Sequence, residues 1–219
     1  MARARSRSPK RVRTLSAPRI HPSALVETGV EIGEDTSVWD SVHLRSGARI
    51  GSQCIVGEKT YVAGATRIGD RVKINAFVYI CAGVTIEDGV MISAGTVFTN
   101  DRFPRATTPD LSTLRPSEPD EHTLPTLVCA GATIGAACTI GNDLRIGRFA
   151  MIGMGSLVTK SIGDFVLALG HPARPCGFVC RCGVPIVRFG PAEPAPDGPL
   201  VCDACGLPYR VVGGALEEA

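Results

Sequence analysis

Four cysteines near the end of the chain have the spacing of a metal site. Cys180 and Cys182 form one pair, and Cys202 and Cys205 follow after 19 residues. Two close thiolate pairs are the ligand set of a zinc ribbon, and a glycine beside each pair favours a tight backbone turn. Four sulfur ligands leave no open position, so we expect a structural Zn²⁺ ion. Disulfide bonds are the alternative, although nothing in the sequence indicates the secreted context that they require.

A polar, proline-rich segment at residues 99–127 is the second place where chemistry could occur. Loops of this length within a compact domain are usually functional or disordered. Arg102 and Arg105 lie in it, and a guanidinium group is suited to bidentate pairing with a carboxylate or a diphosphate. We therefore take both arginines as candidate substrate ligands, with solvated loop charges as the alternative.

The first 19 residues differ in composition from the rest of the chain. They contain seven Lys and Arg side chains and no acid, whereas the whole chain of 219 residues has a formal net charge of only +2. A segment of this composition cannot bury enough apolar surface to fold, so we expect a disordered basic arm. Nucleic acid is not the expected partner. The sequence predicts neither a signal peptide nor a membrane span, and we expect a cytoplasmic protein.

The elements that must position these groups follow from a six-residue repeat. An aliphatic residue recurs at every sixth position from Ile20 to Ile92, Phe98 closes this run, and the period resumes from Val128 to Val158. This period fits neither an α-helix nor the alternation of a simple strand. It predicts a parallel coil with three flat faces, about 18 residues per turn and about 4.8 Å between turns.

The coil explains the composition and divides the chain into parts. A narrow triangular interior has little room for rings, in agreement with the 5% aromatic content. We expect a basic arm at 1–19 and an all-β coil at 20–163 with the inserted loop 99–127. A tail at 164–219 would carry the zinc-ribbon-like cysteines.

Local motifs add a resemblance to a known family. The most specific strings are FTNDRFPRA at 98–106, PTLVCAGATIGAACTIG at 125–141 and GHPARP at 170–175. The chain resembles the hexapeptide-repeat acyltransferase superfamily. Within it, the chain is most similar to bacterial N-acetyltransferases that modify the 3-amino group of a UDP-linked 2-acetamido-3-amino-glucuronate. The resemblance implies a left-handed parallel β-helix, a homotrimer, acetyl-CoA as co-substrate and a nucleotide sugar as acceptor.

The resemblance also indicates the catalytic residues. O-acetyltransferases of this superfamily use a histidine in the loop after a middle coil, and the comparable stretch here, 98–101, has none. An amine of modest basicity is partly neutral at pH 7, so this difference favours N-acylation. Asn100 is expected to orient the amine or the thioester, and Asp101 to take the proton. His43 and Asn75 are further catalytic candidates, and ordinary turn or surface roles are the alternative for all four.

On the cofactor side, the resemblance implies that pantetheine lies along the outside of the coils between two subunits. It places the expected CoA contacts at Ser156, Thr159, Lys160, Gly170, Pro172 and Ala173. Two other classes of function stay open. One is an acyltransferase of the same fold that acts on another amine or on a hydroxyl in secondary metabolism. The other is a non-enzymatic trimeric scaffold.

Overall fold

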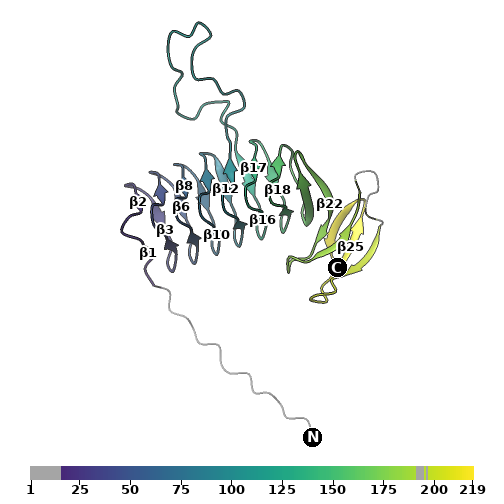
Figure 1. The fold of residues 1–219 in the computed structure, drawn as a ribbon. Helices are drawn as coiled ribbons and strands as arrows, with labels where there is room; N and C mark the ends of the chain where they lie inside the picture. The colour runs from purple at the N-terminus through teal and green to yellow at the C-terminus, as the bar shows by residue number, and fades with distance from the viewer. Residues whose placement is uncertain (1–15, 191–194, 196) are drawn as a thin grey trace.

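The computed structural model describes residues 16–190, 195 and 197–219, and every regular element in these residues is a β-strand. Short strands stack into an elongated coil, and a small β-sheet follows at its C-terminal end (Figure 1). Residues 1–15 of the expected basic arm lie outside the described residues. Ser16 already contacts the coil, because its carbonyl oxygen accepts a hydrogen bond from the Asp35 amide at 2.7 Å.

The coil has three faces, each formed by one strand from every turn. Face 1 consists of β1 (Arg19–Ile20), β4 (Ser37–Val38), β7 (Ile55–Val56), β10 (Lys73–Ile74), β13 (Met91–Ile92), β16 (Thr133–Ile134), β19 (Met151–Ile152) and β21 (Val166–Gly170). Face 2 consists of β2 (Leu25–Val26), β5 (His43–Leu44), β8 (Tyr61–Val62), β11 (Tyr79–Ile80), β14 (Val97–Phe98), β17 (Thr139–Ile140) and β20 (Leu157–Val158). Face 3 consists of β3 (Glu31–Ile32), β6 (Arg49–Ile50), β9 (Arg67–Ile68), β12 (Val84–Ile86), β15 (Thr126–Val128) and β18 (Arg145–Ile146).

The register of the strands confirms the expected turn length. Val38 pairs with Val56, which lies 18 residues later, and Ile74 pairs with Ile92 in the same way. All pairs within the three faces are parallel up to β21, so the fold is a parallel β-solenoid, consistent with the left-handed β-helix that the resemblance implies. We call the turns from face 1 to face 2 the first corner and those from face 2 to face 3 the second corner.

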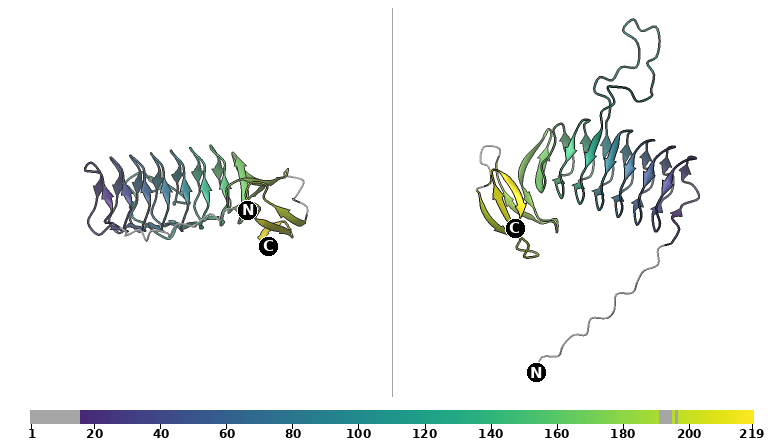
Figure 2. Two further views of the ribbon diagram at one scale, coloured as in Figure 1. Left: turned by 90° about the horizontal axis from the view of Figure 1, so that it is seen from below. Right: turned by 180° about the vertical axis from the view of Figure 1, so that it is seen from behind.

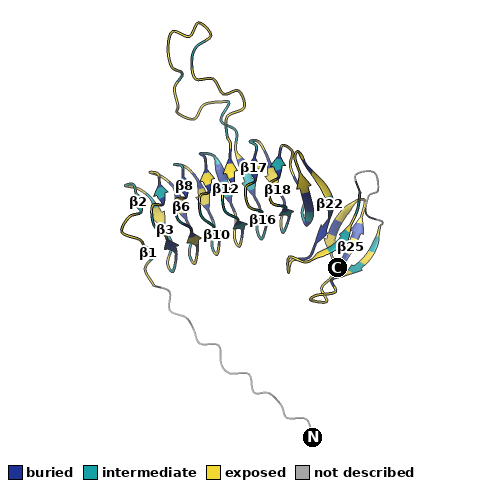
Figure 3. Ribbon diagram, in the orientation of Figure 1, coloured by how far each residue is buried: buried dark blue, intermediate teal, exposed yellow. Residues whose placement is uncertain are grey.

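The interior of the coil is filled as the repeat predicts. The repeating aliphatic residues are buried from Val38 onward, with Ile74 and Ile92 completely enclosed, whereas those of the first turn are partly or fully exposed. Buried strand positions alternate with exposed ones in Figure 3. Threonines near the corners are also buried, and their hydroxyls donate to carbonyl oxygens of a neighbouring turn, as Thr36 does to Gly51 at 2.7 Å. Because every such hydroxyl has an acceptor, the interior holds polar groups at little cost.

Two expected boundaries change in the structure. The inserted loop covers 99–125 rather than 99–127, because β15 begins at Thr126 and pairs with β12. The coil also continues beyond 163, since β21 pairs in parallel with β19 on face 1. The segment around β21 lacks the six-residue spacing, so the sequence pattern did not reveal it. The loop leaves the coil at the second corner and projects away from it (Figure 2).

The tail closes the C-terminal end of the coil. β22 (Ala173–Val179) turns back antiparallel along β21, β23 (Pro185–Arg188) pairs with β22, and a separate sheet contains β24 (Gly198–Val201), β25 (Pro208–Val212) and β26 (Ala215–Glu218). A second buried cluster joins the tail to the last turn. In it, the Phe165 ring stacks on Phe149 at 5.6 Å and meets Tyr209 edge-on at 5.7 Å.

The close approach of successive turns generates the first prediction. A Cβ atom on Gly135 would lie 2.8 Å from the Gly153 carbonyl carbon and would also overlap the Met154 amide nitrogen, both in the next turn. Gly135→Ala should therefore lower the free energy of unfolding by about 1–3 kcal/mol, because backbone must move to make room. Gly190→Ala is the control, since a Cβ there meets nothing within 4 Å. Chemical denaturation should separate the two variants, and equal stability would contradict the tight spacing.

Candidate functional site

A cavity of about 260 Å³ lies where the inserted loop leaves the coil. Face 2 contributes Tyr61 and Tyr79 to its wall, and the root of the loop contributes Asn100, Asp101 and Arg105. The rest of the wall comes from the following coil positions and from the returning part of the loop: Ala63, Cys81, Ala82, Arg115, Pro116, Ser117, Glu118, Pro119, Asp120 and Thr123. Three of the expected site residues therefore lie together at one cavity.

Asn100 is clasped between the coil and the returning loop. The side-chain Nδ2 of Asn100 donates to the Ala82 carbonyl oxygen at 3.1 Å. The backbone carbonyl oxygen of Asn100 accepts from the Leu124 amide at 2.9 Å. The side chain is half-buried and lines the cavity. With Nδ2 engaged by the coil, the amide oxygen is the group suited to accept a hydrogen bond from a ligand.

Asp101 and the two arginines are more exposed than Asn100. The Asp101 carboxylate accepts from the Phe103 amide at 3.0 Å, which forms a turn at the root of the loop. Arg105 lines the cavity and donates to the Pro104 carbonyl oxygen. Arg102 lies with its guanidinium 5.7 Å from the Phe103 ring centre and is not among the cavity residues.

The loop also returns a histidine to this region, which the sequence did not single out as a catalytic residue. His122 accepts a backbone hydrogen bond from Arg102 at 3.2 Å, and its ring meets Phe103 edge-on at 5.8 Å. Its neighbour Thr123 forms a β-bridge with Asp101. The signal was missed because 22 residues separate His122 from Asn100, and only the folded loop brings the two ends together.

His43 belongs to a hub of charged groups on the first turns. Its Nε2 lies 2.8 Å from a carboxylate oxygen of Glu27, and the same carboxylate pairs with Arg45 at 2.7 Å. The Ser46 amide donates to the second oxygen at 2.9 Å. The pKa of Glu27 is lowered to about 2, first because of the Ser46 amide and then because of His43 and Arg45.

Two tyrosines connect this hub to the cavity. The His43 ring meets Tyr61 edge-on at 5.3 Å, and Tyr61 stacks on Tyr79 at 5.0 Å with 6° between the ring planes. Arg45 donates to the Tyr61 hydroxyl at 3.0 Å. Neither tyrosine was predicted. The sequence did contain a signal, because His43, Tyr61 and Tyr79 are 18 residues apart and each precedes an inward-facing position.

The remaining expected residues lie elsewhere on the coil. Asn75 is at the first corner, where its carbonyl oxygen accepts from the Thr60 hydroxyl, and it is not among the residues of the cavity. Ser156 is also at the first corner and is buried, and its hydroxyl accepts from the Gly170 amide at 3.2 Å. Thr159 and Lys160 are exposed at the second corner, beyond β20. The expected CoA contacts thus divide between the two sides of face 2.

The turn between β21 and β22 carries the last of these contacts. Gly170 ends β21, the peptide bond between His171 and Pro172 is cis, and Ala173 begins β22 and is buried. Because Gly170 bonds to Ser156, this turn is attached to the first corner of the preceding coil.

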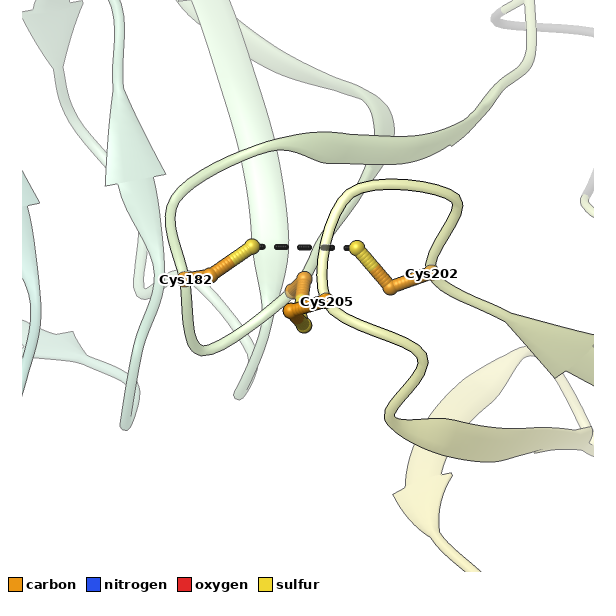
Figure 4. Close-up of side chains that lie close together, drawn as sticks. Cys182, Cys202 and Cys205 are labelled. Carbon is orange, nitrogen blue, oxygen red and sulfur yellow. Dashed lines mark hydrogen bonds between the residues drawn. The ribbon is translucent and has the colours of Figure 1, made fainter. Parts of the chain in front are cut away.

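The four tail cysteines come together as the spacing predicts. Their sulfur atoms all lie within 4.8 Å of one another, with Cys180 and Cys205 at 3.4 Å and Cys182 and Cys202 at 3.7 Å. Figure 4 shows the side chains of Cys182 and Cys202 pointing towards each other from two separate loops. None of the four is in a disulfide. A regular tetrahedral site with Zn–S bonds of about 2.3 Å has sulfur atoms about 3.8 Å apart, so the arrangement fits zinc.

The backbone around these cysteines also fits a metal. The amides of Cys182, Val184 and Leu207 donate to the sulfurs of Cys180, Cys182 and Cys205, respectively. Each donor lies two residues after its sulfur. Such bonds help to hold thiolate charge, which is the form of cysteine that binds metals.

A larger depression of about 520 Å³ lies on face 3, away from the expected catalytic residues. Arg49, Arg67, Glu87 and Asp88 line it. Its lining mixes both signs of charge, and it contains none of the residues that the sequence analysis selected.

Comparison with known proteins supports the repeat. Residues 65–100 match the model of the bacterial transferase hexapeptide family, six repeats. This part of the coil is a hexapeptide-repeat segment. The match includes the strand that carries Tyr79 and ends at Asn100, so it covers part of the cavity wall on face 2 and the beginning of the loop, whereas Tyr61 and Ala63 precede it. No helix in the described part of the chain has the length and apolar character needed to span a membrane.

Two curated proteins are similar to parts of the chain. The dTDP-3-amino-3,6-dideoxy-alpha-D-galactopyranose 3-N-acetyltransferase of Aneurinibacillus thermoaerophilus is 39% identical over 93 residues, which cover 42% of this chain and 44% of that protein. Serine acetyltransferase 4 of Arabidopsis thaliana is 43% identical over 49 residues, which cover 22% of this chain and 14% of that protein. The chain thus spans less than half the length of either curated relative.

Among solved structures, a mutant of AntD, an N-acyltransferase from Bacillus cereus in complex with dTDP and coenzyme A, aligns with a TM-score of 0.46 and 19% identity. The alignment covers 76% of this chain and 85% of that one.

The Glu27 hub generates a prediction about pH. Because the folded pKa of about 2 lies below the usual 4.5, the stabilisation from the carboxylate is complete above about pH 4.5 and is lost as the pH falls through 2. Glu27→Gln should therefore lower the midpoint of thermal unfolding at pH 7, and its difference from the wild type should shrink between pH 4.5 and pH 2.5. Glu34→Gln, a change at an exposed glutamate, is the control. A difference that stays constant with pH would show that ionisation of Glu27 does not matter.

Proposed function

We propose that the chain is an acyl-CoA-dependent N-acetyltransferase that acts on the amino group of a nucleotide-linked amino sugar. The observation that carries this proposal is the cavity at the second corner, where Asn100 presents a fixed amide and no histidine is among the lining residues. The relative of 39% identity, which is named as a 3-N-acetyltransferase of a dTDP-linked amino sugar, supports the same class of acceptor.

The proposed reaction needs little from the protein beyond orientation. The neutral amine attacks the thioester carbonyl, a C–N bond forms, and the C–S bond breaks. The amine loses one proton, and the departing CoA thiolate becomes a thiol. Holding the two reactants in line supplies most of the acceleration. Asn100 accepts a hydrogen bond from the amine, and Asp101 is the nearby carboxylate that can take the proton. Arg102 and Arg105 are the proposed partners of the sugar carboxylate or the diphosphate.

A homotrimer is part of this proposal. Asn100, Thr159 and Lys160 are at the second corner, whereas Ser156 and Gly170 are at the first corner, across face 2. A single chain therefore separates the proposed acceptor residues from part of the proposed CoA contacts. If the second corner of one chain faces the first corner of its neighbour, the two sets meet. The CoA contacts in this arrangement are Ser156, Thr159, Lys160, Gly170, Pro172 and Ala173.

The same fold on another acceptor is the second candidate, and His122 is the observation that favours it. A hydroxyl acceptor requires a general base. His122 is the chain neighbour of Thr123, which forms the β-bridge with Asp101. His122→Asn distinguishes the two candidates. An N-acetyltransferase should keep its rate in this variant, whereas an O-acetyltransferase should lose most of it.

Thiol release from acetyl-CoA over a panel of amines and alcohols tests the function directly. Wild-type protein should release thiol with nucleotide-linked amino sugars, and Asn100→Ala should lower kcat/KM on the order of 10²–10³-fold through loss of orientation. Asp101→Ala should have a smaller effect, because a neutral amine can lose its proton to water after the attack. The rate should fall towards low pH with the acceptor amine's own pKa in both the wild type and Asp101→Ala.

Acetyl-CoA affinity is the control in these experiments, because neither substitution should change it much. Near-normal rates in both variants would place the chemistry elsewhere, with His43 and Asn75 as the next candidates. Absence of thiol release with every amine and alcohol, together with absence of acetyl-CoA binding, would favour the non-enzymatic scaffold.

We also propose that the four tail cysteines hold one structural Zn²⁺ ion. The sulfur distances and the amide donors described above support the assignment, and four protein ligands leave no place for a substrate. The ion would join two loops that 19 residues separate. It would thereby hold the turn at Cys180 and Cys182, which directly follows β22, against the sheet that contains β25.

Metal analysis tests this assignment. Purified protein should contain about one zinc ion per chain, and Cys202→Ser should abolish stoichiometric binding because three thiolates bind far more weakly. Cys176→Ser is the matched control, since the Cys176 sulfur lies near Arg188 and outside the cluster. Full zinc occupancy in Cys202→Ser, or its loss in Cys176→Ser, would show that the ligands are assigned incorrectly.

A further inference from the structure

Three rings form a ladder along face 2. His43, Tyr61 and Tyr79 lie at equivalent positions of β5, β8 and β11, and the strand register pairs each with the next. The first contact is edge-on at 5.3 Å, and the second is a parallel stack at 5.0 Å. A spacing of one turn is close enough for rings to stack, so the coil itself sets this arrangement.

The ladder is fixed at its N-terminal end by charge. The Glu27 carboxylate binds His43 and Arg45, and Arg45 in turn donates to the Tyr61 hydroxyl at 3.0 Å. Since the pKa of Glu27 is about 2, the carboxylate is ionised at neutral pH and these bonds are charge-assisted. His43 and Tyr61 therefore have little freedom to turn, and Tyr61 provides a fixed surface for Tyr79.

The ladder ends at the cavity. The register partner of Tyr79 in the next turn is Val97, which is aliphatic and cannot continue the stack. The inserted loop begins directly after β14, which carries Val97, and Tyr79 and Asn100 line the same cavity. Tyr79 is 45% exposed, whereas Tyr61 between its two neighbours is less so. The last ring of a rigid stack thus borders the space in which we place the acceptor.

We propose that Tyr79 is a stacking platform for a nucleobase of the ligand that enters this cavity. The inference rests on the proposed function, because that reaction has two nucleobase carriers: the nucleotide-linked amine and coenzyme A. The position of Tyr79 beside Asn100 favours the base of the acceptor, and Arg105 in the same wall is suited to its phosphates. Stacking on an aromatic ring tolerates different bases, so the platform alone would not select among nucleotides.

Calorimetric titration with UDP, dTDP, coenzyme A and inorganic pyrophosphate tests the platform. Tyr79→Ala should weaken binding of UDP and dTDP by about tenfold or more, which is the range of base–aromatic stacking. Tyr79→Phe should bind within about twofold of wild type, because it keeps the ring. Pyrophosphate, which has no base, should bind equally to all variants. Phe77→Ala removes another exposed ring, outside the cavity, and should bind as wild type does.

The outcomes separate this inference from the proposed function. If Tyr79→Ala weakens binding of coenzyme A instead of UDP and dTDP, the platform stands and its base is the adenine. If Tyr79→Ala binds all four ligands as wild type does, or if wild type binds no nucleotide, the platform is overturned. If Tyr79→Ala binds all four ligands as wild type does, thiol release with an amino sugar would still support the transferase. Thermal unfolding of Tyr79→Ala identifies any general loss of the fold.

Discussion

The narrow interior of the coil is the constraint on which the rest of the structure depends. Each repeat has room inside for one strand residue and one small or β-branched residue near the corner, as with Val38 and Val42. Neighbouring turns approach so closely that a Cβ on Gly135 would overlap the backbone of the next turn. Little can vary within, so the chemistry lies outside and at the corners. Buried hydroxyls such as that of Thr36 are accepted only because a carbonyl oxygen of a neighbouring turn lies within hydrogen-bond distance.

A rigid interior gives positional accuracy to the exterior. Side chains that point outward from equivalent positions on one face lie one above another, which is how Tyr61 and Tyr79 come to stack. The second corner tolerates the loop 99–125 because the strands on either side keep their register, as the pairing of Val97 with Thr139 across the insertion shows. A long projecting loop is thereby attached to a fixed wall, and the half-buried Asn100 lies at the junction. Sites built in this manner combine orientation with access for a ligand.

The tail solves a different problem, which is the exposed end of a stack of parallel strands. β22 pairs antiparallel with β21 and so continues hydrogen bonding where the repeat stops. Tyr209 then connects two features of the tail, because its hydroxyl lies 3.2 Å from the Cys180 sulfur while its ring packs on Phe165. A metal held by the cysteines would therefore stabilise the aromatic cluster that joins the tail to the coil. The turn at Gly170 connects β21 and β22. The hairpin that covers the end of the coil therefore also carries part of the proposed CoA contacts.

The sequence by itself determined the coil, its turn length and the grouping of the four tail cysteines into one cluster, because each depends on spacing along the chain. The six-residue period sets which residues point inward, and this does not depend on the conformation of the loop or of the tail. The period did not reveal β21, which lacks the repeat. It also did not reveal His122, which the inserted loop returns to Arg102 from 20 residues away.

Only the tertiary structure decided which expected residues share a site. Asn100, Asp101 and Arg105 meet at one cavity, whereas Asn75 and Ser156 lie at the first corner. Residues six apart lie on successive faces, so two repeat positions come into contact only when they share a face and belong to neighbouring turns. The path of a long loop has no period at all. Its contacts depend on hydrogen bonds between distant segments, such as that from Leu124 to Asn100, which form only when the coil holds both ends in place.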